Sequence, residues 1–428
     1  MKKYFSCFLI LGTVFLLLLF SGCQEKTRLT VWSFNDELYK MINGQEDLST
    51  YYTLAFPDIK IDYSVTPEDQ FPKRLDPVLD SGRGAPDIFA LDSTFVRRYV
   101  ESGFLLDITG IHTDNRDKLL TYPVQVGSSE GKVYAMSWQA NPGAMFYRRS
   151  LARKYLGTDN PQIVQTYFSD FGRFLNSARL IKTRSNGACA VIASYKDLQI
   201  PFFSARQDPW VIRDRFIIDS VLDYYLNFAK ELYENRWEGR VDPYSPGWFA
   251  GMRGELKDEN GKAVEIFSYF LPTWGYHDVL KKNAGNTDGD WAMIQGPIGW
   301  YQGGSWIAAW KGTSNPEGAR QMIEWLTTDN EFLEAWALGT GGITANLAVV
   351  NKIKDSFEDT FLGGQNPYAE FAEMAKAVNG RLIQSYDEEI QAIYMEALNS
   401  FVKGEKSRQE AMDDFKAEVM AKFEVFSD

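Results

Sequence analysis

Aromatic rings set among amide and carboxyl side chains are the residues of this chain best suited to chemistry with a ligand. Residues 299–310, GWYQGGSWIAAW, hold three tryptophans, a tyrosine and a Gly-Gly pair in twelve positions. Aromatic rings can cover the apolar C–H faces of a sugar, and Asp, Asn, Gln or Glu can pair its hydroxyl groups. Each ring has packing in a hydrophobic core as its alternative role. The pattern poses a choice between core and ligand surface.

Other site chemistries find less support in the residue inventory. The chain has two histidines, His112 and His277, and three cysteines, with no Cys/His cluster. Zinc sites and histidine-based catalytic triads are therefore not expected, and neither is any metal or cofactor. The glycine runs at 339–342 and 363–367 lack the context of a phosphate-binding loop. A pair of catalytic carboxyl groups stays open, although no short motif indicates one.

The N-terminus has the pattern of an export signal. Lys2 and Lys3 precede an apolar run, and small residues stand just before Cys23. This order is typical of a signal peptide over residues 1–22, with a permanent membrane anchor as the alternative. Residues 19–23, LFSGC, resemble the lipobox of bacterial lipoproteins, except that Phe20 stands where leucine is usual. The resemblance implies a lipidated Cys23, carrying palmitate or a similar acyl chain, a tether over 23–28 and an extracytoplasmic protein anchored to the membrane.

Charge and cysteine content limit the partners of the mature chain. The net charge is −12, and the loss of Lys2 and Lys3 with the signal makes it −14. Nucleic acid and anionic lipid headgroups are not expected partners, because they require clustered Lys and Arg. Cys189 is left without a partner, so no disulfide forms within the mature chain. About 400 residues are enough to build two hydrophobic cores.

Strand and helix patterns alternate along the first three quarters of the chain. Period-two and buried-strand patterns predict strands over 28–34, 59–65 and 86–92, with helices over 36–55, 68–81 and 93–103. Short connections of this kind imply right-handed crossovers and a parallel sheet. A second α/β block follows, with strands over 132–138, 143–148, 188–194, 263–271 and 290–297 and helices over 165–181 and 219–237. Beyond residue 310 helices are predicted over 316–328, 330–338, 366–378, 387–402 and 407–424.

Five segments in order resemble the extracellular solute-binding proteins of ABC transporters, specifically the sugar-binding family 1. LTVWSF at 29–34 resembles the first strand of that family. APDIFALDSTFVRRYVESGFLLDIT at 85–109 resembles its third strand and the helix after it. Residues 131–157 and 258–280 resemble the passage between lobes and a strand that leads to a cleft tryptophan. Residues 301–328 resemble the return to the first lobe. The similarity covers roughly residues 28–350.

The resemblance implies a two-lobed α/β fold of the periplasmic-binding-protein type II. Each lobe would be a mainly parallel sheet flanked by helices, and two or three hinge crossings would join the lobes. The expected lobes are 29–138 plus 304–341 and 139–303 plus 342–428. The implied protein is a monomeric receptor without enzymatic activity. It would close on a carbohydrate and present it to the permease subunits of an ABC importer.

Candidate ligand residues come from strand ends, crossings and loops. In open α/β sheets ligands sit beyond the carboxyl ends of strands. Trp274 matches the stacking position of the family, and Trp32 stands where the family has a cleft residue. Core packing, helix capping and turn formation are the alternatives at every position. The candidates are Trp32, Asn35, Asp92, Gln139, Asn141, Trp210, Trp274, Trp300, Tyr301, Gln302, Gly304 and Asn346.

The stretch that contains Gly303 and Gly304 is expected to divide between two roles. Residues 304–310 read as a strand whose period-two face holds Trp306, Ala308 and Trp310, which predicts core packing for both tryptophans. Trp300, Tyr301 and Gln302 precede the glycines at the predicted crossing, where they would reach a ligand.

Two alternative functions remain open from the sequence. An exported glycan-acting hydrolase would use paired carboxyl groups, and a binding protein could instead signal through a sensor kinase. The identity and length of the sugar are not determined by these patterns.

Overall fold

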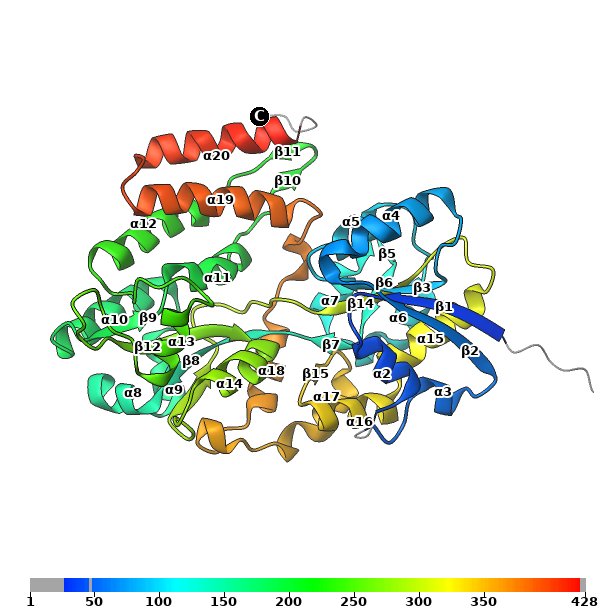
Figure 1. Ribbon diagram of the computed structural model, residues 1–428, viewed down its shortest axis with the longest axis horizontal. Coiled ribbons are helices and arrows are strands. Elements are labelled where there is room, and N and C mark those ends of the chain that lie inside the picture. The colour runs from blue at the N-terminus through cyan, green and yellow to red at the C-terminus, as the bar shows by residue number, and fades with distance from the viewer. Residues whose placement is uncertain (1–26, 46–47, 424–428) are drawn as a thin grey trace, which may run out of the picture.

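The chain folds into two bodies of helices and strands that lie side by side (Figure 1). The structure is a computed structural model that describes residues 27–45 and 48–423. The predicted signal peptide, Cys23 and the first part of the tether lie outside the described residues. Within the described ranges, no helix has the length and apolar character that crossing a membrane requires.

The first body is built on a five-stranded sheet with the order β2-β1-β3-β14-β6. β1 (Thr27–Ser33), β2 (Ile59–Val65) and β3 (Ile88–Asp92) are parallel, whereas β14 (Ser305–Ala309) and β6 (Ala135–Ser137) join antiparallel. The first four residues of β3 are buried, as expected for a parallel strand covered on both faces. In Figure 1, α4 (Phe71–Ser81) and α5 (Val96–Glu101) lie over one face, and α15 (Pro316–Thr328) lies over the other.

Further elements complete this side of the molecule. They are α2 (Glu37–Asn43), α3 (Tyr52–Ala55), η1 (Glu68–Gln70), α6 (Thr109–Asn115), η2 (Arg116–Lys118), α7 (Thr121–Val126), β4 (Ser128–Ser129), β5 (Lys132–Val133), α16 (Asn330–Thr340) and α17 (Leu347–Ile353).

The second body is built on a four-stranded sheet with the order β13-β8-β12-β9. Its strands are β13 (Trp291–Ile294), β8 (Gly143–Arg148), β12 (Glu265–Pro272) and β9 (Cys189–Ile192). Both faces are buried, because Phe146 on β8 packs into one hydrophobic cluster and its neighbours Met145 and Tyr147 pack into the other. The predicted core role of Cys189 agrees with its position, since its side chain is buried in β9.

Helices and short strands surround the second sheet. They are α8 (Arg149–Leu156), α9 (Pro161–Tyr167), α10 (Phe171–Arg184), η3 (Tyr195–Leu198), α11 (Gln199–Ser204), β10 (Val211–Ile212), β11 (Arg215–Phe216), α12 (Ser220–Glu234), α13 (Pro246–Arg253), η4 (Gly275–Leu280), α14 (Lys281–Asn283), η5 (Lys354–Ser356), η6 (Thr360–Leu362), α18 (Pro367–Lys376), α19 (Asp387–Val402) and α20 (Arg408–Lys422). Between α18 and α19, η7 (Gly380–Leu382) packs against α7 of the first body, where Gly380 N donates to Gln125 Oε1 at 2.9 Å. In Figure 1, α19 and α20 form the outer edge of this body.

The sheets are mixed, which corrects the prediction that each is mainly parallel. In the second sheet β8 pairs antiparallel with both β12 and β13, and the β12–β9 pair is parallel. In the first sheet β14 and β6 run opposite to the strands beside them. These strands lead into or out of the passage between the bodies, so their direction is set by the crossing rather than by a βαβ connection.

Three chain segments meet between the two sheets. β7 (Gln139–Ala140) pairs antiparallel with β15 (Ile343–Thr344), and Pro142 forms an isolated bridge with Tyr301. The lobe boundaries predicted near residues 139, 304 and 342 fall in these segments and remain a prediction.

Two predicted helices are each divided in the structure. The expected helix over 36–55 becomes α2 and α3, because Gly44 with φ +90° ends α2. The expected helix over 165–181 is interrupted before Asp170, whose side chain accepts a hydrogen bond from Arg173 N and so starts α10. A glycine with positive φ and an N-capping aspartate are both known signals for the end or start of a helix. The two predicted helices extend across these signals and are therefore too long.

A tryptophan packs directly on the backbone where β8 begins. Gly143 donates its N–H to the carbonyl of Trp300 at 2.8 Å, and Trp300 is 1% exposed. A Cβ at Gly143 would lie 2.1 Å from the Trp300 ring. The ring fills the place that a side chain would occupy, so glycine is required here by close approach.

We expect Gly143→Ala to lower the free energy of unfolding by about 1–3 kcal/mol, because the added methyl group overpacks the Trp300 contact. Urea unfolding of the mature chain measures this change. Gly110→Ala is the matched control, since a Cβ there meets nothing within 4 Å and alanine favours the helix. Equal stability of the two variants would contradict the proposed contact.

Candidate functional site

A cavity of about 650 Å³ lies between the two sheets. Residues that follow β1 and β3 line it from the first body, and residues that follow β12 line it from the second. The crossing segments line it between these two groups. The lining residues are Phe34, Asn35, Glu37, Glu68, Asp92, Ser93, Thr94, Gln139, Asn141, Thr273, Trp274, His277, Asp278, Gln302, Gly303, Gly304, Ser305, Trp336, Thr340 and Gly342.

Hydrogen bonds between the crossings fix Trp274 at the cavity wall. Its ring N–H donates to the carbonyl of Gln302 at 3.0 Å, and Gln302 N donates to the carbonyl of Asn141 at 3.1 Å. Gly303 has φ +78°, and a Cβ there would lie 2.8 Å from Trp274 Nε1. The indole is therefore held by one polar contact while it stays partly exposed to the cavity.

Asp92 presents one carboxylate oxygen to the site. Its Oδ1 accepts hydrogen bonds from Thr94 N at 2.8 Å and from Ser93 Oγ at 3.3 Å. Ser93 N in turn donates to the carbonyl of Gly304 at 3.0 Å, which joins the end of β3 to the second crossing. Since Oδ1 satisfies the local turn, Oδ2 is the acceptor left for a ligand.

Glu37 is a partly buried acid at the start of α2. The Trp138 ring N–H donates to its Oε1 at 3.2 Å, and Asn35 Oδ1 accepts from Glu37 N at 3.1 Å. Burial raises the pKa of Glu37 to about 6, although the hydrogen bonds from Trp138 and Trp336 act in the opposite direction. The cavity thus holds an acid that can both accept and, when protonated, donate a hydrogen bond.

Acidic residues supply the charge of the cavity lining. Glu37, Glu68, Asp92 and Asp278 line it, whereas no lysine or arginine is among the lining residues. Burial lowers the pKa of His277, which favours its neutral form. Across residues 27–45 and 48–423, no group of three His, Cys, Asp or Glu residues is placed to hold a metal ion.

A smaller cavity of about 190 Å³ adjoins the first and shares Ser93, Thr94, Gln302 and Gly303 with it. Tyr301 and residues of α11 and α19 line this smaller space. Arg206 also lines it, but the Arg206 side chain is 1% exposed and forms an ion pair with Asp387 at 3.1 Å. Its guanidinium also lies 4.4 Å from the centre of the Trp210 ring. Arg206 is thus paired within the protein through Nη2, whereas its Nη1 is buried without a hydrogen-bond partner among the described residues.

The structure brings together most of the residues predicted to bind a ligand. The predicted residues that line the main cavity are Asn35, Asp92, Gln139, Asn141, Trp274, Gln302 and Gly304. Tyr301 lines the smaller adjoining cavity, although its side chain is largely buried. Contact between these residues and a ligand stays a prediction.

The interpretation of Trp32 as a cavity residue is wrong. Leu29, Val31 and Ser33 point into the core from one face of β1, so the period-two alternation places Trp32 on the opposite face. There Arg74 of α4 lies over the Trp32 ring, 4.0 Å from its centre. Trp32 is absent from the cavity lining for this reason.

Trp210 and Trp300 are also corrected, because both are core residues. Trp210 is 0% exposed and packs against Phe216 and Phe415 beneath α20. Trp300 lies on Gly143, as described above, and packs near Phe270 in the core of the second body. The predicted core position of Trp306 is confirmed by its 1% exposure, and Trp310 packs partly buried against the same core.

Asn346 serves as a helix cap rather than a ligand residue. Its Oδ1 accepts from Ala348 N at 2.9 Å at the start of α17, and its Nδ2 donates to the carbonyl of Thr328 at 3.0 Å. The side chain is 0% exposed, so its polar atoms are used within the fold.

Several lining residues were missed in the sequence. Glu37 and Glu68 follow β1 and β2, so the rule that selected Asp92 at the end of β3 would have found them. Trp336 and Thr340 lie in α16, far along the chain from these strand ends. Their place at the cavity depends on how α16 packs, which no local pattern indicated.

Comparisons with known proteins agree with this architecture. Residues 50–360 match a family model described as bacterial extracellular solute-binding protein. The arabinooligosaccharide-binding protein of Bacillus subtilis (strain 168) is 27% identical over 182 residues, 39% of this chain and 40% of that protein. The match thus spans well under two thirds of that relative.

Solved structures share the fold over nearly the whole chain. A protein described as extracellular solute-binding protein family 1 has a TM-score of 0.78 at 20% identity, covering 92% of this chain and 98% of the other. The sugar-binding protein MalE of Xanthomonas citri has a TM-score of 0.71 at 16% identity, with the same coverage. The lacto-N-biose-binding protein of Bifidobacterium longum has a TM-score of 0.67 at 16% identity, covering 94% and 99%. The predicted periplasmic-binding-protein-like α/β fold is confirmed, with mixed rather than mainly parallel sheets.

Glu37 should make stability depend on pH. Because its pKa rises from 4.5 to about 6 on folding, the folded protein binds the proton more tightly than the unfolded chain. Stability from this group is therefore lost as the pH rises through that window, by about 1–2 kcal/mol in a partly screened setting.

Glu37→Gln removes the titrating group and keeps an oxygen for the Trp138 hydrogen bond. The free energy of unfolding of Glu37→Gln minus that of wild type should increase by that amount between pH 4.5 and 6. Above pH 6 the difference should stay constant. Unfolding by urea at a series of pH values measures the difference. Glu396→Gln, at an exposed position of α19, is the control. A constant difference between Glu37→Gln and wild type would contradict the expectation.

Proposed function

The chain belongs to the bacterial extracellular solute-binding protein family, and on that premise we propose that it captures a carbohydrate between its lobes for an ABC importer. The family consists of solute-binding receptors rather than enzymes. The hydrolase alternative left open by the sequence therefore gives way to a binding role. The proposed ligand is a mono- or oligosaccharide.

The observation that carries this proposal is the composition of the 650 Å³ cavity. Trp274 offers part of an indole ring, while Asn141, Gln139 and Gln302 offer amides and Asp92 offers a free carboxylate oxygen. Rings cover the C–H face of a sugar, and amides and carboxylates pair hydroxyl groups in both senses. Relatives with carbohydrate names, such as the arabinooligosaccharide-binding protein, support the same class of ligand.

Closure of the lobes around the ligand is the proposed mechanism. The cavity has walls on both bodies, so a bound saccharide would touch both at once and favour the closed arrangement. Gly303 and Gly304, with φ +78° and +114°, give the second crossing backbone freedom that other residues lack. The closed form would be the state that the permease subunits recognise.

The proposed location follows from the N-terminal pattern. Cys23 would carry the lipid after the signal peptide is removed, and the short tether would hold a monomeric receptor at the outer side of the cell membrane. Membership in an extracellular family supports export. The acidic net charge suits a body that is held at the membrane by lipid rather than by basic side chains.

Binding is tested with the mature protein and a panel of neutral saccharides, including arabino-, galacto- and malto-oligosaccharides. A ligand present at 100 times its Kd should raise the free energy of unfolding by about 2.7 kcal/mol, which a thermal shift detects. Trp274→Ala should then weaken binding roughly 10- to 100-fold, because ring stacking and burial are lost. Titration calorimetry measures both affinities.

Trp32→Ala is the matched control, since it removes a partly exposed indole outside the cavity and should leave affinity unchanged. If peptides or inorganic anions produce a thermal shift and no saccharide does, the carbohydrate assignment is refuted. Equal weakening by the two substitutions would refute the role of Trp274.

Lipidation is tested by Cys23→Ser in the full chain. The wild-type protein should incorporate labelled palmitate and partition with detergent or membranes, whereas the variant should do neither, because the acceptor thiol is absent. Cys189→Ser is the control, since that thiol lies buried in the mature fold. Unchanged label in Cys23→Ser would remove the lipid anchor from the proposal.

A further inference from the structure

Carboxyl groups from both bodies face one another at the mouth of the cleft. Glu68 begins η1 just beyond β2, Asp92 ends β3, and Glu388 lies in the first turn of α19. Glu68, Thr94 and Glu388 line a common cavity of about 510 Å³ that continues the main one. Glu68 and Asp92 therefore belong to the first body, and Glu388 approaches them from the second.

The three groups are close enough to affect one another. The pKa of Glu68 is raised by burial first and then by the negative charges of Asp92 and Glu388. The pKa of Glu388 is raised by burial, by Glu389 and by Asp92. Like charges that face each other in this way repel, and the repulsion acts across the space that a ligand would fill.

No free cation balances these groups within the described part of the cleft. The acids that line the three adjoining cavities are Glu37, Glu68, Asp69, Asp92, Asp278, Asp387 and Glu388. Arg206 is the one lysine or arginine among the described residues of the same linings. Its side chain is 1% exposed and pairs with Asp387 through Nη2, while Nη1 is buried without a hydrogen-bond partner in the described part of the chain. Asp278 is balanced from outside the linings by Lys282 at 2.7 Å, so Glu68, Asp92 and Glu388 carry the repulsion. A ligand anion would therefore find no exposed arginine or lysine in these linings, as far as the structure describes them.

We propose that this cleft selects saccharides by charge, taking neutral or ammonium-bearing ligands and excluding those that carry a carboxylate, phosphate or sulfate. The inference rests on the proposed carbohydrate function and narrows its substrate class. Closure around an anionic sugar would enclose one more negative charge among carboxylates while water is displaced, so repulsion would grow. An ammonium group in the same place would instead lower the repulsion between Glu68, Asp92 and Glu388.

Three forms of one saccharide test the selection. The first is the tightest-binding neutral oligosaccharide of the panel, the second is its uronate, made by oxidation of a primary hydroxyl group, and the third is the methyl ester of that uronate. The ester is neutral but bulkier than the carboxylate, so it separates charge from shape. We expect the uronate to bind at least tenfold more weakly than the parent and the ester to bind within about threefold of it.

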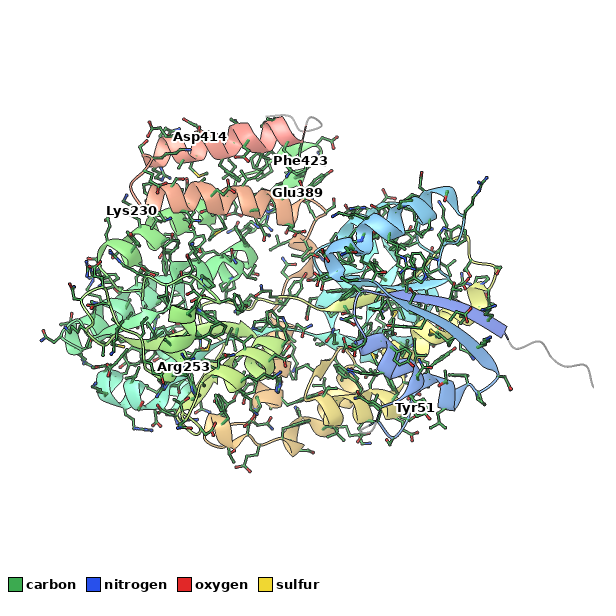
Figure 2. The ribbon with its side chains drawn as sticks, in the orientation of Figure 1. Tyr51, Lys230, Arg253, Glu389, Asp414 and Phe423 are labelled. Carbon is green, nitrogen blue, oxygen red and sulfur yellow. The ribbon has the colours of Figure 1, made fainter. Side chains whose placement is uncertain are left out.

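Variants assign the effect to the cleft carboxylates. Glu68→Gln and Glu388→Gln should each reduce the difference in affinity between the ester and the uronate, because each removes one repelling charge. Asp414→Asn is the control, since Asp414 lies on α20 (Figure 2), pairs with Lys406 at 2.7 Å and lines none of the three cavities. In this control variant the difference in affinity between the ester and the uronate should equal that of wild type.

The outcomes separate the two proposals. A uronate that binds as tightly as the neutral parent, or an ester that binds as weakly as the uronate, would overturn charge selection and leave carbohydrate binding intact. A difference in affinity between the ester and the uronate that stays unchanged in both cleft variants would also overturn it. Absence of binding by every saccharide of the panel would remove the proposed function and the selection that rests on it.

Discussion

The hydrogen bonds that join the crossing segments are the constraint on which the rest of this structure depends. Gly143 N to Trp300 O, Gln302 N to Asn141 O and Ser93 N to Gly304 O connect the start of β8, the second crossing and the end of β3. They hold the ends of both sheets against one cavity while the chain passes between the bodies. Because these contacts are made by the backbone, they fix positions and leave side chains such as Gln302 free for a ligand.

The cleft is acidic because the side chains at the strand ends and at the start of α19 are carboxylates. Strand ends contribute Glu37, Glu68 and Asp92, and α19 brings Glu388 from the other body. Arg206, the one arginine or lysine among the described residues that line these cavities, is buried against Trp210 and Asp387. Burial of an arginine is tolerated when a carboxylate pairs with it, so this residue serves the packing of α11 and α19. The result is an acidic space bounded by ring and amide groups.

Sequence patterns predicted the positions of the main strands correctly, but they did not predict which strands pair antiparallel. The runs at 59–65 and 88–92 were apolar or alternating over the whole strand, so their existence followed from periodicity. The direction of β8 and β14 depends on which neighbour each strand meets after a crossing. That pairing is a long-range choice that no window of residues contains. The family resemblance was confirmed because it relied on the order of five segments rather than on one pattern.

The sequence by itself determined the fold family, the exported character of the family and the strand ends where Asp92 and Trp274 stand. Only the tertiary structure decided which rings belong to the core and which to the cleft. Trp32, Trp210, Trp274 and Trp300 all stand beside strands, turns or glycines, yet three of them face packed elements and Trp274 alone among them lines the main cavity. The physical reason is that burial depends on the partner that covers a side chain. Arg74, Phe415 and Gly143 lie far along the chain from the indoles they contact.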